Sequence, residues 1–260
     1  MTSRDEKNGL PELGPGERID ALGRDGLRII QNPGLFCFTT DVYLLAAFAR
    51  PDPDDAVLEL GSGSGAIVLL LAGRTKATRV VGLEIQEALV ELARRNMALN
   101  GLAGRAEVIQ HDLRVERALA PERFDLVVAN PPYISLGAGC WSRHEPMALA
   151  KIELACTLAD VVQAAARWLK DHGRFVLMHR PERLPEILAE LLRLHLSPKQ
   201  LVFIHPKPAE AANTILVEAR SGARPGLTVG PPLFVRDERG AFTREMEEIF
   251  AGRWPRAAII

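Results

Sequence analysis

Between residues 56 and 219 the sequence alternates between short apolar runs and longer segments with helical periodicity, and this alternation constrains the fold more than any other feature. Apolar runs bounded by Gly, Pro and polar residues predict strands, whereas apolar residues spaced three or four apart predict helices. Strands that alternate with helices favour a mainly parallel sheet covered on both faces. The predicted strands are 56–60, 79–84, 106–110, 124–129, 173–179, 201–205 and 214–219.

The predicted helices lie between these strands and at both ends of the chain. No helix separates the last two strands, which we therefore expect to form an antiparallel pair at the sheet edge. The expected fold is α/β, with a seven-stranded, mostly parallel sheet and an antiparallel last strand. The helices are expected at 41–49, 66–73, 87–100, 153–169, 184–195 and, as a short element, near 243–250.

Composition shifts divide the chain into four expected parts. Residues 1–17 are rich in Gly, Pro and charge, which is typical of a mobile tail. A segment over 18–55 precedes the α/β domain, which we place at 56–220. A Gly- and Pro-rich extension follows over 221–260.

Charge and cysteine content set broad limits on partners and setting. The 260 residues carry a net charge of −1, so any contact with nucleic acid must use a local basic face. Cys37, Cys140 and Cys156 show no C-x-x-C spacing, which fits a reduced, cytoplasmic protein. No apolar run is long enough to cross a membrane, the N-terminus lacks the apolar stretch of a signal peptide, and no metal-ligand spacing is present.

A glycine loop directly follows the strand predicted at 56–60. Its sequence is Glu59-Leu-Gly61-Ser-Gly63-Ser-Gly65, and a predicted helix comes next. Glycines in this context allow a tight turn and the close approach of a ligand to the backbone. A strand-to-helix turn without a ligand is the alternative. The G-x-G-x-G spacing differs from the G-x-G-x-x-G of dinucleotide-binding proteins.

Two acidic residues follow the next two predicted strands. Glu84 lies at the distance from the loop at which an acid can accept the ribose hydroxyls of a nucleoside cofactor. Asp112 follows the third strand, where its carboxylate could accept a hydrogen bond from an adenine amine. A solvated glutamate and a loop-starting aspartate are the alternatives for these two positions.

The tetrapeptide Asn130-Pro131-Pro132-Tyr133 comes at the carboxyl end of the fourth predicted strand, and ligands of open α/β sheets bind at that edge. The Asn130 side-chain oxygen and the Pro131 carbonyl could each accept a hydrogen from one NH₂ group, while Tyr133 offers a ring for stacking. Two acceptors would make a planar amine or amide nitrogen nucleophilic. The alternative is a rigid turn that closes the strand.

In order and spacing, these motifs resemble those of the class I methyltransferases, whose fold is Rossmann-like, and the tetrapeptide resembles that of the amino-methyltransferases. The resemblance implies that S-adenosyl-L-methionine is the cofactor and that the catalytic residues are Asn130, Pro131, Pro132 and Tyr133. It also implies a set of cofactor-binding residues. They are Glu59, Gly61, Gly63, Gly65, Glu84, Ile85, Asp112, Leu113 and Asn130.

A finer resemblance extends over most of residues 18–235. The segment 36–41 is similar to the upstream segment of the bacterial tRNA(adenine-N6)-methyltransferases, and 179–183 and 212–214 are similar to their C-terminal half. This resemblance implies methyl transfer to the adenine beside the anticodon of a valine tRNA. It adds Phe38, Thr40 and Asp41 to the cofactor pocket, although Thr40 or Asp41 could simply cap a helix.

Basic residues at predicted loops are candidate RNA contacts, and the loop 134–150 is a candidate substrate lid. Other functions stay open: glutamine methylation of protein release factors, methylation of guanine N2 or of DNA adenine, a nicotinamide-dependent oxidoreductase, and a cofactor-binding module without catalysis. The candidate RNA contacts are Arg143, His144, Arg180, Arg183, Lys199 and Lys207.

Overall fold

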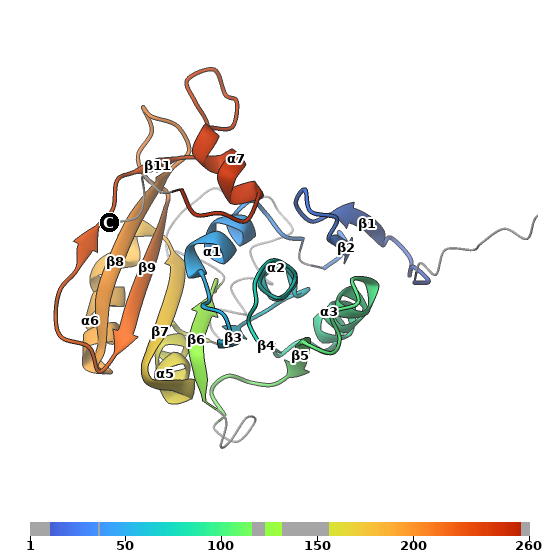
Figure 1. The fold of residues 1–260 in the computed structure, drawn as a ribbon, viewed down its shortest axis with the longest axis horizontal. Coiled ribbons are helices and arrows are strands. Elements are labelled where there is room, and N and C mark those ends of the chain that lie inside the picture. Colours follow the sequence, from blue (N-terminus) through green and yellow to red (C-terminus); the bar gives the residue numbers. More distant parts are fainter. Residues whose placement is uncertain (1–10, 36, 116–122, 132–155, 256–260) are drawn as a thin grey trace, which may run out of the picture.

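A computed structural model describes residues 11–35, 37–115, 123–131 and 156–255. Its centre is a twisted sheet with strand order β10-β8-β9-β7-β6-β3-β4-β5, and β11 also pairs with β8 (Figure 1). The seven long strands are β3 (Ala56–Leu60), β4 (Arg79–Glu84), β5 (Ala106–Gln110), β6 (Phe124–Ala129), β7 (Leu169–His179), β8 (Leu196–His205) and β9 (Thr214–Ser221).

Strand β9 is antiparallel to both of its neighbours, β7 and β8, while all other pairings of the sheet are parallel. The predicted α/β fold with a mostly parallel sheet and an antiparallel last strand is therefore confirmed. Two short strands, β10 (Thr228–Val229) and β11 (Leu233–Phe234), were not predicted and bring the sheet to nine strands. At two residues each, they are too short to leave a periodic pattern.

Helices cover both faces of the sheet, because the central strands are apolar on both sides. In β6, for example, Leu126 and Val128 pack into one core and Val127 and Ala129 into the other. The first core lies under α1 (Asp41–Ala49) and α2 (Ala66–Arg74), with α3 (Glu87–Leu99) beside β5; the second lies under α5 (Leu158–Trp168) and α6 (Leu184–Arg193) (Figure 1). Among the described helices, none is long and apolar enough to cross a membrane.

Helix α5 begins at Leu158, later than the predicted start at residue 153, and residues 153–155 lie outside the described part. The reason is a capping box. The Asp160 amide donates to the Thr157 hydroxyl at 3.2 Å, and the Thr157 amide donates to the Asp160 carboxylate at 2.8 Å. These bonds satisfy backbone groups that a longer helix would have paired internally.

An N-terminal hairpin, β1 (Arg18–Ala21) and β2 (Arg28–Gln31), lies beside α3 and was not predicted (Figure 1). Asn96 of α3 and Asn100, which directly follows the helix, bond to the backbone of β2 in the way that a neighbouring strand would. The Ile30 amide donates to Asn96 Oδ1 at 2.6 Å, and Asn96 Nδ2 donates back to the Ile30 carbonyl at 3.2 Å. Asn100 makes the same pair of bonds with the backbone of Arg28.

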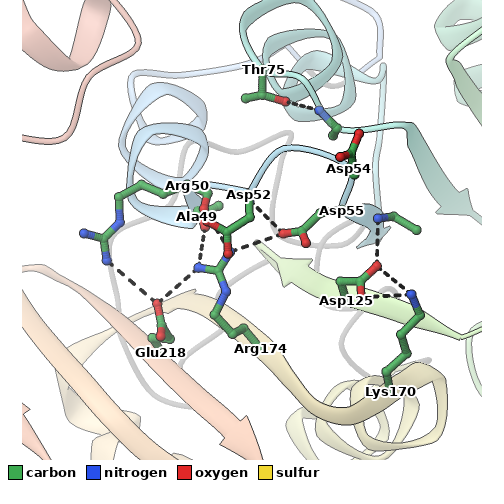
Figure 2. A network of polar contacts seen from close by, with 12 residues as sticks. Ala49, Arg50, Asp52, Asp54, Asp55, Thr75, Asp125, Lys170, Arg174 and Glu218 are labelled. Carbon is green, nitrogen blue, oxygen red and sulfur yellow. Dashed lines mark hydrogen bonds and ion pairs between the residues drawn. The ribbon is translucent and has the colours of Figure 1, made fainter.

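A polar network holds the C-terminal end of α1 on the sheet (Figure 2). The buried Arg174 of β7 donates to the carbonyls of Ala49 and Arg50 at 3.0 and 2.8 Å. Its guanidinium also lies 3.5 Å from Asp55 and 3.6 Å from the buried Glu218 of β9. A cation at a helix C-terminus is stabilising. This anchor directs the other end of α1 toward the carboxyl ends of the strands.

A short C-terminal helix, α7 (Arg244–Phe250), covers the outer side of α1. The ring of Phe250 lies edge-on to that of Tyr43, with centroids 5.2 Å apart. The predicted short helix near 243–250 is therefore confirmed, with Thr243 as its N-cap.

Candidate active site

The sheet order reverses at β3, which lies between β4 and β6. Ligands of doubly wound folds bind at the carboxyl ends of the strands beside such a reversal. The register pairs Leu60 with Ala129, so the glycine loop that follows β3 and Asn130 that follows β6 leave the sheet at the same level. The structure therefore brings the two main sequence motifs together at one edge.

The three glycines of the loop all have positive φ angles, of 73° at Gly61, 54° at Gly63 and 81° at Gly65. A Cβ built at Gly61 or Gly63 would meet nothing within 4 Å, so one side of the loop is open to a ligand. A Cβ at Gly65 would lie 2.8 Å from Met97 Cε and 3.1 Å from Ala93 Cβ. Gly65 therefore permits the packing of α3, while Gly61 and Gly63 leave room at the open side.

Glu84 joins the loop to the end of β4. One carboxylate oxygen accepts the Gly63 amide at 2.9 Å, and the other accepts the Gln86 amide at 2.9 Å. The side chain is buried, at 7% exposure. Each carboxylate oxygen can accept a further hydrogen bond, so the side chain keeps capacity for ribose hydroxyls while it holds the loop.

Two polar atoms beneath the loop have no hydrogen-bond partner in the described part of the chain: Glu59 Oε2 and Ser62 Oγ. Glu59 is 1% exposed. Burial raises the pKa of Glu59 well above its ordinary value, a hydrogen bond from the Val68 amide lowers it, and the nearby Glu84 raises it further. Unsatisfied buried polar groups are rare. Their position beside an open glycine loop fits a site that is completed by a polar ligand.

Asp112 follows β5 at the same edge, and the His111 amide donates to the Glu84 carbonyl at 2.8 Å, which ties the two strand ends together. The Asp112 carboxylate accepts from Arg114 Nη2 at 2.5 Å and from the Arg114 amide at 2.9 Å. These hydrogen bonds from Arg114 lower the pKa of Asp112, partly opposed by burial. Asp112 is therefore an ionised acceptor at neutral pH.

The two apolar residues predicted for the cofactor site lie next to these acids. Ile85, directly after Glu84, is 51% exposed. Leu113 is partly buried, and its carbonyl accepts from Arg167 at 3.1 Å. An exposed Ile85 offers an apolar surface for a flat ring.

Asn130 and Pro131 are half-buried at the end of β6. Pro132 and Tyr133, predicted to be catalytic, lie outside the described residues, as do Arg143, His144 and the candidate lid at 134–150. The structure thus places the first half of the tetrapeptide beside the glycine loop.

The upstream residues Phe38, Thr40 and Asp41 lie at the start of α1. The Phe38 amide donates to Gln31 Oε1 at 3.1 Å. Thr40 and Asp41 line a cavity of about 300 Å³ together with Arg180, at the carboxyl ends of β7 and β8. Burial raises the pKa of Asp41, while Thr39 and Arg180 lower it. No residue of the glycine loop lines this cavity.

Asn96, which the sequence analysis did not single out, helps to position the glycine loop. Asn96 of α3 is fully buried, and its Nδ2 donates to the Ser64 carbonyl at 3.0 Å, in addition to its bonds to Ile30. It therefore connects the glycine loop to the N-terminal hairpin. A polar residue on the apolar face of α3, three positions after Ala93, is the signal in the sequence that could have revealed it.

The glycine loop after β3, Glu84 at the end of β4 and Asn130-Pro131 after β6 together define a class I methyltransferase. S-adenosylmethionine is the cofactor of this class. The chain belongs to the methyltransferase domain family, whose model matches residues 51–212.

Similar proteins narrow this assignment. A protein of Porphyromonas gingivalis named tRNA1(Val) (adenine(37)-N6)-methyltransferase is 30% identical over 188 residues, which cover 70% of this chain and 73% of that protein. A predicted O-methyltransferase from Agrobacterium tumefaciens is structurally similar, with a TM-score of 0.66, 28% identity and coverage of 82% of this chain and 96% of the other. A 16S rRNA methyltransferase of T. thermophilus, solved with AdoMet and guanosine, shares the fold at a TM-score of 0.56 and 24% identity, over 81% of this chain and 52% of the other.

Proposed function

We propose that this protein transfers a methyl group from S-adenosylmethionine to the exocyclic N6 of adenine in tRNA, at the adenine beside the anticodon of a valine tRNA. The observation that carries the proposal is the placement of Asn130 and Pro131 level with the glycine loop, on the other side of the sheet reversal. The name and coverage of the Porphyromonas gingivalis relative support the choice of acceptor.

The cofactor would lie over β3, β4 and β5. Gly61 and Gly63 would allow it to approach the backbone, Glu84 would accept ribose hydroxyls, and Ile85 and Asp112 would flank the adenine ring. Glu59 Oε2 and Ser62 Oγ, the two atoms beneath the loop without a hydrogen-bond partner in the described residues, fit a polar group of the ligand near the loop. When bound, S-adenosylmethionine supplies an electrophilic methyl group on a sulfonium.

Asn130 and Pro131, the first two residues of the tetrapeptide, would bind the adenine amine that accepts the methyl group. The Asn130 amide oxygen and the Pro131 carbonyl would each accept a hydrogen bond from one N–H of the adenine amine. These bonds would favour a pyramidal nitrogen, whose lone pair is no longer delocalised into the ring. Positioning and electrostatics of this kind suffice, because methyl transfer needs no covalent enzyme intermediate. The target base must leave any stack to reach this edge.

Variants of Asn130 test the proposed chemistry. Asn130→Ala removes the acceptor oxygen, so we expect methyl transfer to fall by about 10²-fold or more, the typical effect of losing one preorganised hydrogen-bonding group. S-adenosylmethionine affinity, measured by calorimetry, should stay near that of the wild type. Turnover by Asn130→Ala close to the wild-type rate would exclude the proposed role of this residue.

The cellular compartment follows from the proposed substrate. A tRNA-modifying enzyme with the free, partly buried thiols Cys37 and Cys156 fits the cytoplasm. Methylation of a release-factor glutamine or of another RNA would be seen as incorporation of labelled methyl into those substrates and not into tRNA.

A further inference from the structure

The sheet divides into two halves at its reversal. The glycine loop, Glu84 and Asp112 follow β3, β4 and β5, whereas β6, β7, β9 and β8 lie on the other side of β3. Thr40 and Asp41, which the family resemblance placed in the cofactor pocket, lie on this second side. The cavity of about 300 Å³ lies at the same edge of this second half. Its volume is at the lower end of the range for small-ligand sites.

The cavity lies on the side of the sheet that α1 and α2 cover, because Leu44 and Ile204 line it and belong to the core there. Val128 and Met178 belong to the core under α1 and α2, and side chains two residues apart in a strand share a face. Arg180, two positions after Met178 and still extended at φ −79° and ψ 141°, therefore faces this side, and Asn130 directly follows the neighbouring strand β6. Thr214 and Ile204, which pair with each other, line the cavity on the next two strands. At a strand spacing of about 5 Å, the cavity begins about 5–15 Å from Asn130.

Its lining is rich in cations. Arg180, Lys207 and Arg236 face the cavity together with Asp41 and Glu210. The three cations outnumber the two acids of the lining. The lining thus carries a formal charge of +1 (three cations less two acids), in a chain whose net charge is −1.

Two of the cations donate hydrogen bonds to backbone carbonyls, and Arg180 also interacts with the Asp41 carboxylate. Arg180 Nη1 donates to the Asn213 carbonyl at 2.8 Å, and Arg236 Nη1 donates to the Gly240 carbonyl at 2.7 Å. The Arg236 guanidinium also lies 4.2 Å from the centre of the Phe242 ring. Carbonyls and rings orient a guanidinium without cancelling its charge, so the contacts of Arg236 prepare it for an anion.

We propose that this cavity binds a backbone phosphate of the RNA strand next to the target adenine. The inference rests on the proposed function, and it assigns the β7–β9–β8 edge to the substrate strand. A phosphate held one or two strands away from Asn130 would fix the position of the RNA strand along the sheet edge. The adenine next to that phosphate would then lie at the tetrapeptide. Phosphate contacts of this kind position a nucleic acid without reading its sequence.

The test compares three variants that each remove one positive charge. Lys207→Gln and Arg236→Gln change the cavity. Lys76→Gln is the matched control. Lys76 is an exposed lysine before β4, at the amino ends of the strands and so on the side of the sheet away from the cavity. For each protein we would measure kcat and KM for tRNA methylation, the Kd for tRNA by filter binding, and the Kd for S-adenosylmethionine, at 50 and 200 mM salt. Thermal melting would check that all variants are folded.

We expect both cavity variants to raise KM and Kd for tRNA by about three- to tenfold at low salt, with kcat and cofactor affinity unchanged. The slope of log Kd against log salt should fall by about 0.7–0.9 for each lost phosphate contact. Cavity variants that match Lys76→Gln in both KM and salt slope would overturn the phosphate site while tRNA methylation stands. A wild-type protein that methylates no adenine in tRNA would overturn both proposals.

Discussion

The carboxylate of Glu84 accepts the Gly63 amide at 2.9 Å, so the acid expected to bind the cofactor ribose also holds the glycine loop in shape. Its second oxygen accepts the Gln86 amide at the start of α3. One buried side chain thereby fixes the loop after β3 against the end of β4. The two motifs, separated in sequence, act as a single unit.

Replacing Glu84 should weaken cofactor binding because Gln presents an N–H group where the carboxylate accepts from a backbone amide. Hydrogen bonds to charged groups contribute about 1.5–3 kcal/mol, so we expect Glu84→Gln to raise the Kd for S-adenosylmethionine by about 10- to 100-fold in calorimetry. Glu107→Gln, at an exposed position on β5 beside Arg79, is the control. Equal affinities for the two variants would show that Glu84 does not organise the site.

Alanine at Gly63 and at Gly65 should have different effects, because only one of the two positions is crowded. Both have positive φ, which costs an L-residue about 1–2 kcal/mol. At Gly65 the added methyl also meets Met97 and Ala93, so Gly65→Ala should lower the free energy of unfolding by a further 1–3 kcal/mol, roughly. Urea denaturation measures both changes. A Gly63→Ala variant that is the less stable of the pair would contradict this account.

Asn96→Ala should destabilise the fold and loosen the loop. The substitution leaves the Ile30 amide, the Ile30 carbonyl and the Ser64 carbonyl without their partner in a buried setting. We expect a loss of about 2–4 kcal/mol of unfolding free energy, since each unsatisfied buried group costs about 1–3 kcal/mol. Asn100→Ala, whose bonds to Arg28 are more exposed, should cost less. An equal cost at the two positions would argue against the special role of Asn96.

The stability of the protein should depend on His179 at mildly acidic pH. Burial, reinforced by Arg183, lowers the pKa of His179 from 6.5 to about 4, and its Nδ1 accepts the Arg180 amide at 2.8 Å. The folded state therefore favours neutral His179. This stability is present above the unfolded pKa of 6.5 and is lost as the pH falls toward about 4.

We expect His179→Gln to be less sensitive than the wild type to acid between pH 6.5 and 4, by about 2–3 kcal/mol in unfolding free energy across that window. Urea denaturation at several pH values measures the difference. The exposed His195, replaced by Asn because its φ is 57°, is the control. Parallel pH profiles for the wild type and His179→Gln would refute the assignment.

Much of the central sheet could be predicted because its signals are local. The strands at 56–60, 79–84, 106–110 and 124–129 have the predicted bounds, since each is an apolar run closed by polar residues, Gly or Pro. The hairpin of β1 and β2 was missed because each strand has only four residues, and because the backbone groups of Arg28 and Ile30 bond to Asn100 and Asn96, far away in sequence. Periodicity carries no information about such partners.

The candidate site was predictable as a set of residues and less so as a set of contacts. Motif order indicated that Gly61, Glu84 and Asn130 would meet at one edge, and the register of β3 with β6 and β4 brings them there. That Glu84 holds Gly63 and that Arg114 pairs with Asp112 depends on side-chain geometry, which spacing does not encode. The roles of these residues in binding and catalysis stay predictions.

The measurement that tests the central claim most directly is nucleoside mass spectrometry of tRNA. Bulk tRNA from a strain that lacks this gene would be incubated with the purified protein and methyl-labelled S-adenosylmethionine. The account predicts labelled N6-methyladenosine, located beside the anticodon of a valine tRNA. Cofactor binding without any labelled adenine in tRNA would contradict it and would direct the search to release factors or another RNA.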